Sequence, residues 1–335
     1  MASPHDTGDT EQPALFDVPP PPPAADPEEP AAPQPEQPTL FDAALEPAPE
    51  LTRDNAAGTR SAPSRDRASE VAQSAGDDAV EPAATAATVP HGAARREVGA
   101  APSWTAGERA AFDLETTGRD PQEARIVTAS VVLVDATGTV TREWEWLADP
   151  GIEIPAEAAA VHGVTTERAR AEGRPAAEVT AQLHDVLSGL WRAGIPVLAF
   201  NAAYDLTVLA RESERHGLPA PAPMPVLDPF VLNKQVHRYR RGKRTLGALC
   251  EEYGVVLDAA HTSAADALAT ERLATALVER FAELERPAEE LHELQIGWAA
   301  EQAASLQEYF RRRDPEAVVD GTWPVHPRPW DRSHP

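Results

Sequence analysis

The hydrophobic pattern of residues 104–285 restricts the fold more than any other feature of the sequence. Three apolar runs of strand length come first, and two shorter apolar runs then alternate with helical patterns. Such an order predicts a mixed sheet covered by helices. We therefore expect an α/β domain whose mixed five-stranded sheet is flanked by helices. The expected strands are 110–114, 126–134, 140–147, 196–200 and 226–228.

Apolar residues at helical spacing mark the segments between and after these runs. In the segment 176–191, for example, Val179, Leu183 and Leu187 recur on one face of a helix. Residues 286–335 are expected to form a C-terminal helix and an irregular extension, either a polymerase-docking element or a cover for the core. The other expected helices span 203–216, 245–253, 264–284 and 287–312.

Residues 1–103 have a composition of a different kind. They hold 18 of the 34 prolines, including five in a row at 19–23, and few aromatic residues. Such a segment cannot bury enough apolar surface to offset the entropy lost on ordering. We therefore expect a long disordered N-terminal tail, rich in Pro and Ala and acidic.

Charge and cysteine content limit the setting in which the chain works. Half of the formal net charge of −24 lies in the tail, and the total gives no support for tight nonspecific DNA binding. A single cysteine, Cys250, excludes an intramolecular disulfide and suits a reducing compartment. No apolar run reaches the length of a membrane span. The chain has only two lysines, a bias that GC-rich genomes produce, so we expect a bacterial protein. We expect it to be cytoplasmic and nucleoid-associated, without a membrane partner.

Three short acidic segments indicate the chemistry. Asp113 and Glu115 lie two residues apart at the end of a strand, so their side chains share one face. Asp205 and Asp266 each begin a predicted helix, and His261 precedes the second of these. Clustered carboxylates raise one another's pKa unless a cation lies between them, and oxygen ligands favour Mg²⁺ or Mn²⁺ over zinc. Two such ions can bind the attacking and leaving oxygens of a phosphodiester.

Each segment alone also has an ordinary structural explanation: a solvated strand end, a helix N-terminal carboxylate or a loop histidine. Together, and in this order, they resemble the DEDDh group of DnaQ-like 3′–5′ exonucleases, which have a ribonuclease H-like fold and include the proofreading (epsilon) subunit of bacterial replicative DNA polymerase. The family motif D-x-E-T-T-G is matched at 113–118. H-N-A-x-F-D reads F-N-A-A-Y-D at 200–205, and H-x-A-x-x-D reads H-T-S-A-A-D at 261–266. V-H-G-V-T at 161–165 matches a family turn after the third strand.

The resemblance covers about residues 107–285 and implies a role for each motif residue. Asp113, Glu115 and Asp266 would hold one of two Mg²⁺ (or Mn²⁺) ions, and Asp113 and Asp205 the other. His261 would deprotonate the water that attacks the 3′-terminal phosphodiester, because a neutral imidazole near its own pKa is a suitable base. The candidates for holding the terminal nucleotide are Thr116, His162 and Asn201.

The loop 237–244 is the one concentrated run of positive charge in the sequence. Basic residues around an aromatic ring suit a single nucleic-acid strand, with phosphates on Arg240 and Arg241 and a base stacked on Tyr239. A solvated surface loop is the alternative interpretation.

The tail contains one internal repeat, E-Q-P-A-L-F-D at 11–17 and E-Q-P-T-L-F-D at 36–42. Both copies resemble the Q-x-x-L-F peptide by which bacterial replication and repair proteins bind the sliding clamp. The spacer between them could extend to roughly 65 Å, so two sites on one ring could be bound together. A local duplication without function is the alternative. The residues that would bind the clamp are Gln12, Leu15, Phe16, Gln37, Leu40 and Phe41.

The sequence therefore predicts a metal-dependent 3′–5′ exonuclease that acts on single-stranded DNA ends in proofreading or repair, tethered to the clamp and with a DNA polymerase as a further candidate partner. Two alternatives stay open. One is an RNA-trimming exonuclease, because the same motifs serve both substrates. The other is a catalytically silent clamp-binding adaptor, against which the intact set of five catalytic residues argues.

Overall fold

The structure, a computed structural model, describes residues 102–257 and 262–328. The tail lies outside the described residues, so its expected disorder stays a prediction. Within the part that is described, none of the helices combines the length and the apolar character needed to cross a membrane.

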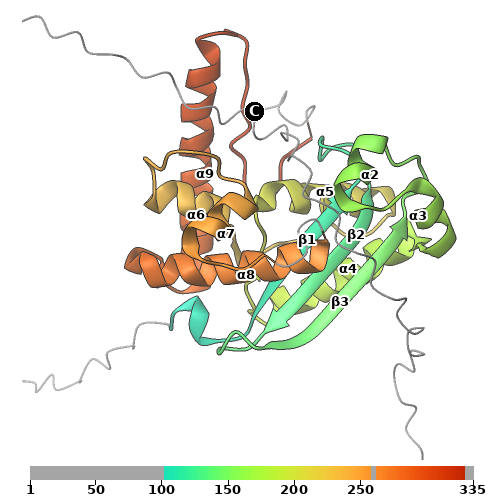
Figure 1. The fold of residues 1–335 in the computed structure, drawn as a ribbon, viewed down its shortest axis with the longest axis horizontal. Coiled ribbons are helices and arrows are strands. Elements are labelled where there is room, and N and C mark those ends of the chain that lie inside the picture. The colour runs from blue at the N-terminus through green and yellow to red at the C-terminus, as the bar shows by residue number, and fades with distance from the viewer. Residues whose placement is uncertain (1–101, 258–261, 329–335) are drawn as a thin grey trace, which may run out of the picture. The chain divides into compact units, whose positions relative to one another are not determined.

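Six strands form one mixed sheet in the order β4-β3-β2-β1-β5-β6 (Figure 1). Five of them are the strands expected from the sequence, and β4 is an addition of two residues, too short for any pattern to predict. The strands β1, β2 and β3 are antiparallel neighbours, whereas β5 pairs parallel with β1 and β6 parallel with β5. Their bounds are β1 Arg109–Thr116, β2 Ile126–Val134, β3 Val140–Asp149, β4 Arg174–Pro175, β5 Val197–Leu198 and β6 Val226–Leu227.

The helices follow the expected order, with two differences. Two short helices, α2 and α3, follow β3 where a turn was expected, because each has only two turns and neither carries an apolar stripe long enough to recognise. The helix α8 also ends earlier than expected, at Arg280, and a 3₁₀ turn follows it. The α-helices are α2 Ala156–His162, α3 Thr166–Glu172, α4 Ala176–Arg192, α5 Ala202–Arg215, α6 Pro229–Val236, α7 Leu246–Tyr253, α8 Ser263–Arg280 and α9 Ala288–Arg311.

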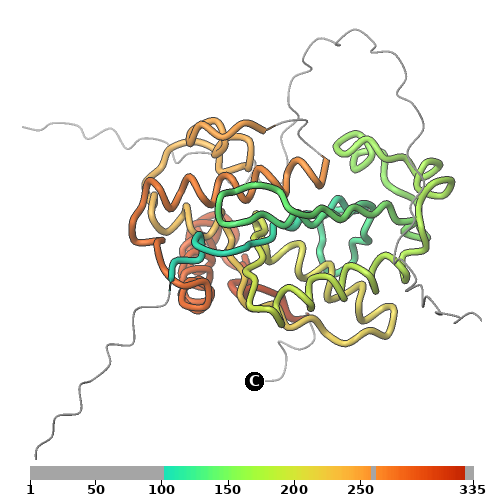
Figure 2. Tube along the Cα trace, turned by 90° about the horizontal axis from the view of Figure 1, so that it is seen from below, coloured from blue at the N-terminus to red at the C-terminus, as the bar shows by residue number. Residues whose placement is uncertain are grey.

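The alternation of β1 sends its residues to two different cores. Ala110, Phe112 and Leu114 pack with side chains of α4 and α5, whereas Ala111 packs with Ala267 of α8. Figure 2 shows α4 and α5 on one side of the strands and α8 on the other. Because side chains alternate along a strand, Asp113 and Glu115 belong to the α8 face. Their neighbours Phe112 and Leu114 are buried on the opposite face, and this burial fixes the register of β1.

The C-terminal segment contributes to the core on the α4 and α5 face and to a further hydrophobic cluster around α7 and α8. Leu291 of α9 is fully buried in a cluster with residues of α7 and α8, and Trp323 is buried in the cluster on the α4 and α5 face. Beyond α9 the chain lies along α5, where the backbone N–H of His326 donates to Thr207 Oγ1 at 2.8 Å and Arg211 donates to the His326 carbonyl at 2.9 Å. The helix α5 is therefore held from outside by residues more than a hundred positions away.

Candidate active site

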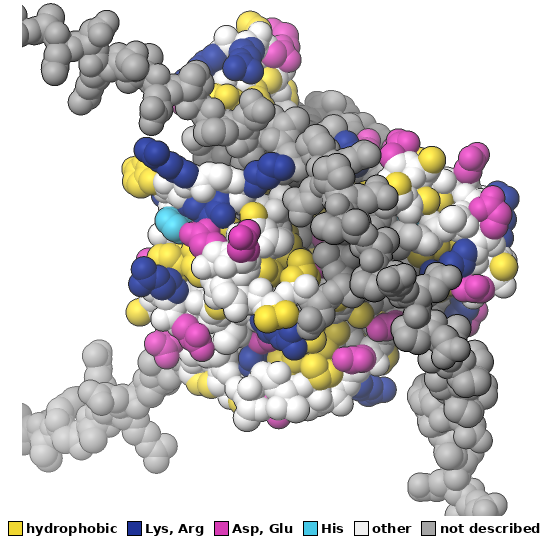
Figure 3. All heavy atoms as spheres, in the orientation of Figure 1, with side chains coloured by type: hydrophobic (Ala, Val, Ile, Leu, Met, Phe, Trp, Pro, Cys, Tyr) yellow, Lys and Arg dark blue, Asp and Glu magenta, His cyan; other side chains and the backbone are white. Residues whose placement is uncertain are grey.

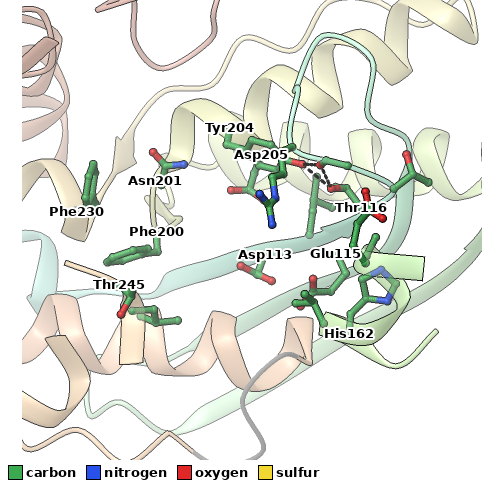
Figure 4. A pocket seen from close by; sticks show the side chains of 18 of the residues that line it. Asp113, Glu115, Thr116, His162, Phe200, Asn201, Tyr204, Asp205, Phe230 and Thr245 are labelled. Atoms are coloured by element: carbon green, nitrogen blue, oxygen red, sulfur yellow. Dashed lines mark hydrogen bonds between the residues drawn. The ribbon is translucent and has the colours of Figure 1, made fainter. Parts of the chain in front are cut away.

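The sheet and α8 bring three carboxylates together. One carboxylate oxygen each from Asp113, Glu115 and Asp266 lies within 4.8 Å of the other two. Two of these residues come from the α8 face of β1, and the third lies in the first turn of α8, where its backbone N–H donates to the Thr262 carbonyl at 3.0 Å. Figure 4 shows Asp113 and Glu115 on the same side of their strand. The expected cluster is formed by elements distant in sequence.

The fourth carboxylate, Asp205, lies in the first turn of α5 and is 5% exposed. It is not one of the three clustered groups, but it lines the same cleft as Asp113, and its charge helps to raise the pKa of Asp113. Burial raises the pKa of Asp205 itself well above its ordinary value, and a hydrogen bond from the Leu114 backbone offsets part of that rise. Asp205 therefore lies within electrostatic range of both Asp113 and Glu115.

Without a cation, these carboxylates are in an unfavourable environment. Burial raises the pKa of Asp113 well above its ordinary value, and the charges of Asp205, Glu115 and Asp266 raise it further. Burial, with the nearby Asp266, raises the pKa of Glu115 from 4.5 to about 8. A divalent cation would reverse both effects, since it favours the ionised form and satisfies the oxygen atoms. The donor set, all carboxylate oxygen, fits Mg²⁺ or Mn²⁺.

The fifth residue of the expected set, His261, lies outside the described residues. Its role as the base stays a prediction.

Asp113, Glu115 and Asp205 line a cleft of about 670 Å³. The cleft is lined by the end of β1, by α2, by the start of α5 and by the loop before α7. The rings of Phe200 and Phe230 stand edge to face in it, with centroids 5.7 Å apart. Other lining residues include Thr116, Gly118, His162, Asn201, Tyr204, Arg244, Thr245 and Leu246.

Thr116 and Tyr204 join the end of β1 to α5 at the cleft. The Thr116 hydroxyl lies 2.5 Å from the Tyr204 hydroxyl and donates to the Gly118 carbonyl at 2.9 Å. The Tyr204 hydroxyl donates to the same carbonyl (Figure 4). Tyr204 stands where the resembled motif has Phe, so its hydroxyl adds a link that the motif does not contain.

His162 and Asn201 also line the cleft, as expected of groups that would hold a nucleotide. His162 ends α2, and its Nδ1 accepts the Val164 backbone N–H at 3.2 Å, so the ring carries its proton on Nε2. Burial lowers the pKa of His162, which keeps the ring neutral. Asn201 precedes α5 in a left-handed backbone conformation, with φ of 61°.

The structure does not bring Arg240 and Arg241 to the cleft. Arg240 forms an ion pair with Glu252 and donates to the Lys243 carbonyl, and both arginines line a separate shallow depression of about 610 Å³. Figure 3 shows Lys and Arg side chains gathered around α6 and α7.

Arg244, the last residue of the same loop, does line the cleft, and so does Arg119, which follows β1. Arg244 is held by the Asn233 side chain at 3.1 Å and the His237 carbonyl at 2.6 Å. Sequence reasoning missed Arg244, although its place directly before the Thr245 N-cap of α7 was a usable signal.

A mixed sheet with a carboxylate cluster at the end of its first strand defines the class, an α/β domain of the ribonuclease H-like type with a candidate site for divalent cations. Residues 110–274 match the family model RNase_T, described as exonuclease. This domain therefore belongs to the RNase T/DnaQ-like exonuclease family.

Curated relatives share the same part of the chain. A "DNA polymerase III subunit epsilon-like protein" of Rhodobacter capsulatus is 33% identical over 163 residues, which are 48% of this chain and 22% of the relative. A "DNA polymerase III PolC-type" of Streptococcus thermophilus is 27% identical over 163 residues, or 48% of this chain and 10% of the relative. The chain thus spans less than a quarter of the length of either. A crystal structure of E. coli exonuclease I in complex with a dA16 oligonucleotide aligns with a TM-score of 0.48 at 20% identity, covering 53% of this chain and 42% of that chain.

Proposed function

We propose that this protein is a metal-dependent 3′–5′ exonuclease that hydrolyses the terminal phosphodiester of single-stranded DNA and releases nucleoside monophosphates. The observation that carries the proposal is the approach of Asp113, Glu115 and Asp266 to within 4.8 Å, next to a cleft that Asp113, Glu115 and Asp205 line. Carboxylates in such an arrangement have no structural use, because their mutual repulsion destabilises the fold unless cations are bound.

Each catalytic residue has a distinct task. Asp113, Glu115 and Asp266 would hold one Mg²⁺ or Mn²⁺ ion, and Asp113 and Asp205 a second. Bound there, the ions would supply positive charge to the attacking and leaving oxygens of the phosphodiester. His261 would accept the proton of the attacking water.

The cleft walls would position the 3′-terminal nucleotide. Thr116, His162 and Asn201 offer hydrogen-bonding groups, while Phe200 and Phe230 offer ring surfaces on which a base can stack. Arg244 offers the cleft a cation for a phosphate. A cleft of about 670 Å³ is of the size of a small-ligand site, which favours one unpaired end over a duplex.

The biological setting that we propose is proofreading or repair. It rests on the relatives, whose names are those of DNA polymerase III proteins, and it makes a DNA polymerase a candidate partner.

We also propose that the tail tethers the enzyme to the sliding clamp. The motif residues Gln12, Leu15, Phe16, Gln37, Leu40 and Phe41 lie outside the described residues, so this proposal rests on the repeated sequence. Replacing Leu15, Phe16, Leu40 and Phe41 by Ala should abolish clamp binding in a surface-binding assay and leave cleavage of short free oligonucleotides unchanged. Equal clamp affinity of the two proteins would reject the tether and leave the nuclease untouched.

Digestion of end-labelled substrates tests the enzyme itself. With Mg²⁺, single-stranded DNA and mismatched primer ends should yield mononucleotides, and RNA of the same sequence should be cut more slowly. Faster cleavage of RNA would favour the RNA-trimming alternative, and no hydrolysis of any substrate would favour the adaptor. The variant His261→Ala should slow the chemical step by roughly 10²–10⁴-fold at unchanged metal affinity, as expected for a general base that is not a ligand.

A further inference from the structure

A single buried carboxylate, that of Asp228, caps two helices at once. Asp228 directly follows β6, is 1% exposed and is the N-cap of α6, where it accepts the Phe230 backbone N–H at 2.9 Å. The same carboxylate accepts the backbone N–H groups of Asn201 and Ala202, also at 2.9 Å. These two amides begin α5, the helix that carries Asp205. The side chain of the N-cap residue of α5, Asn201, makes no capping hydrogen bond.

The C-terminal helix α9 holds Asp228 in place. Gln295 is fully buried, and its side-chain carbonyl accepts the Asp228 backbone N–H at 2.7 Å while its amide donates to the Val226 carbonyl at 3.0 Å. His292 accepts the Val226 N–H at 3.1 Å through Nδ1. Two side chains of α9 thereby satisfy backbone groups of β6, the last strand of the sheet. Both lie beyond residue 274, where the family match ends.

The start of α5 needs such support. Asn201 has a left-handed backbone, which costs free energy for a residue other than glycine and persists only where surrounding contacts impose it. Asp205 follows Ala202 by less than one helical turn, so a shift of this end of α5 moves its carboxylate relative to Asp113.

We propose that Asp228 is a positioning residue for the metal ligand Asp205, and that α9 acts on the metal site through Gln295 and Asp228. This inference rests on the proposed function, since it assigns Asp205 to the metal site. It also gives the C-terminal segment a task in catalysis: the segment sets the position of one carboxylate without touching the substrate.

The substitution Asp228→Asn separates the two caps. Oδ1 of Asp228 accepts from Asn201 and Phe230, whereas Oδ2 accepts from Ala202. An asparagine with its oxygen in the Oδ1 position keeps the α6 cap and turns an N–H₂ donor toward the Ala202 N–H. The change therefore removes the acceptor of the Ala202 N–H at the start of α5 and keeps the Phe230 bond of the α6 cap.

Two readouts test the proposal in the full-length protein. In metal-free Asp228→Asn, hydrogen exchange of the amides at 202–206 should accelerate about tenfold or more, as expected when a hydrogen bond to a charged group is lost, while β1 and β2 keep their protection. Mn²⁺ affinity, measured by calorimetry, should fall about 10–100-fold, the usual effect of removing a group that orients a metal ligand. The rate of hydrolysis should recover as the Mg²⁺ concentration is raised.

Two matched substitutions in α9 serve as the second test. Gln295→Met removes the contact to Asp228, whereas Gln302→Met removes a comparable bond, from Nε2 to the Val231 carbonyl at 3.1 Å, on the same helix. Only Gln295→Met should weaken Mn²⁺ binding, and this pair decides the question if Asp228→Asn does not fold. Unchanged exchange and unchanged Mn²⁺ affinity in the Asp228 and Gln295 variants would overturn the proposal. A wild-type protein that binds Mn²⁺ but hydrolyses nothing would instead refute the proposed function.

Discussion

Arg109 of β1 and Glu271 of α8 form a buried ion pair. Nε and Nη2 of Arg109 lie 2.7 and 2.6 Å from Oε1 of Glu271, and each side chain is 3% exposed. Arg109 also donates to the Asp135 carbonyl at 2.9 Å, and Glu271 accepts from Thr275 at 2.9 Å, so both charges have further partners. The pair joins the strand that carries Asp113 and Glu115 to the helix that carries Asp266.

Breaking this pair should destabilise the domain strongly. Glu271→Gln leaves the guanidinium of Arg109 buried without its counter-charge, which costs about 3–5 kcal/mol in comparable sites. Denaturant unfolding should show that loss of free energy of unfolding. Glu172→Gln is the matched control, since its pair with Arg168 is exposed on α3 and should be worth less than about 1 kcal/mol. An equal loss in both variants would contradict the role of the buried pair.

Asp113→Asn should abolish hydrolysis and yet stabilise the metal-free protein. The substitution removes a metal ligand, and it also removes the charge that is repelled by Asp205, Glu115 and Asp266. We expect a residual rate below a few per cent and a gain of about 1–3 kcal/mol in the free energy of unfolding at pH 8 with a chelator present. Asp185→Asn, whose side chain is 87% exposed, should change neither quantity. Substantial activity in Asp113→Asn would refute the assignment of the metal ligands.

The metal-free protein should lose stability as the pH rises. In the folded state the pKa of Glu115 is raised from 4.5 to about 8, so the folded protein holds this proton more tightly than the unfolded chain does. The resulting stabilisation is fully present below pH 4.5 and is lost as the pH rises through about 8.

Chelator-treated protein unfolded in denaturant at pH 5–9 tests this pH dependence. We expect a decline on the order of 2–4 kcal/mol that is much smaller in Glu115→Gln and that saturating Mg²⁺ offsets, because the ion binds the ionised form. Stability that rises with pH in the wild type relative to Glu115→Gln would contradict the raised pKa.

Tyr204→Phe should affect substrate binding more than the chemical step. It removes the hydroxyl that joins Thr116 and Gly118 to α5, and Thr116 keeps its own bond to the Gly118 carbonyl. We expect a loss of about 1 kcal/mol in the free energy of unfolding and a rise in KM that exceeds the change in kcat, since no carboxylate moves. Steady-state kinetics would check this, with Tyr239→Phe, 90% exposed, as the control that should behave as wild type. A drop in kcat alone would show that Tyr204 acts on the chemical step.

Much of the fold could be predicted because its pattern is local. The strands β1, β2 and β3 and the helices α4, α5, α7 and α9 follow from periodicities of two and 3.6 residues over consecutive positions. The elements that could not be predicted are too short or lack a periodic pattern of apolar residues. β4 has two residues, and α2 buries none of its side chains, so no apolar stripe marks it.

Some residues of the candidate site could likewise be predicted from the sequence, and others could not. The identities of Asp113, Glu115, Asp205 and Asp266 could be predicted from their motifs, and the approach of three of them is confirmed. Which arginine of the basic loop lines the cleft could not be predicted, because Arg240 and Arg244 belong to one basic run and differ only in their partners. Arg240 forms an ion pair with Glu252, whereas Arg244 donates to the Asn233 side chain and to the His237 carbonyl.

The sequence by itself determined the residue types of the site, their order along the chain and the faces of the elements that carry them, because these depend on neighbouring positions. Only the tertiary structure decided how those elements are held together. Arg109 and Glu271 are 162 positions apart, and Gln295 meets Asp228 across 67. Pairings over such distances in sequence depend on how the helices pack against the sheet. That packing decides which polar groups are buried, and a buried polar group is stable only with a hydrogen-bond partner nearby in space.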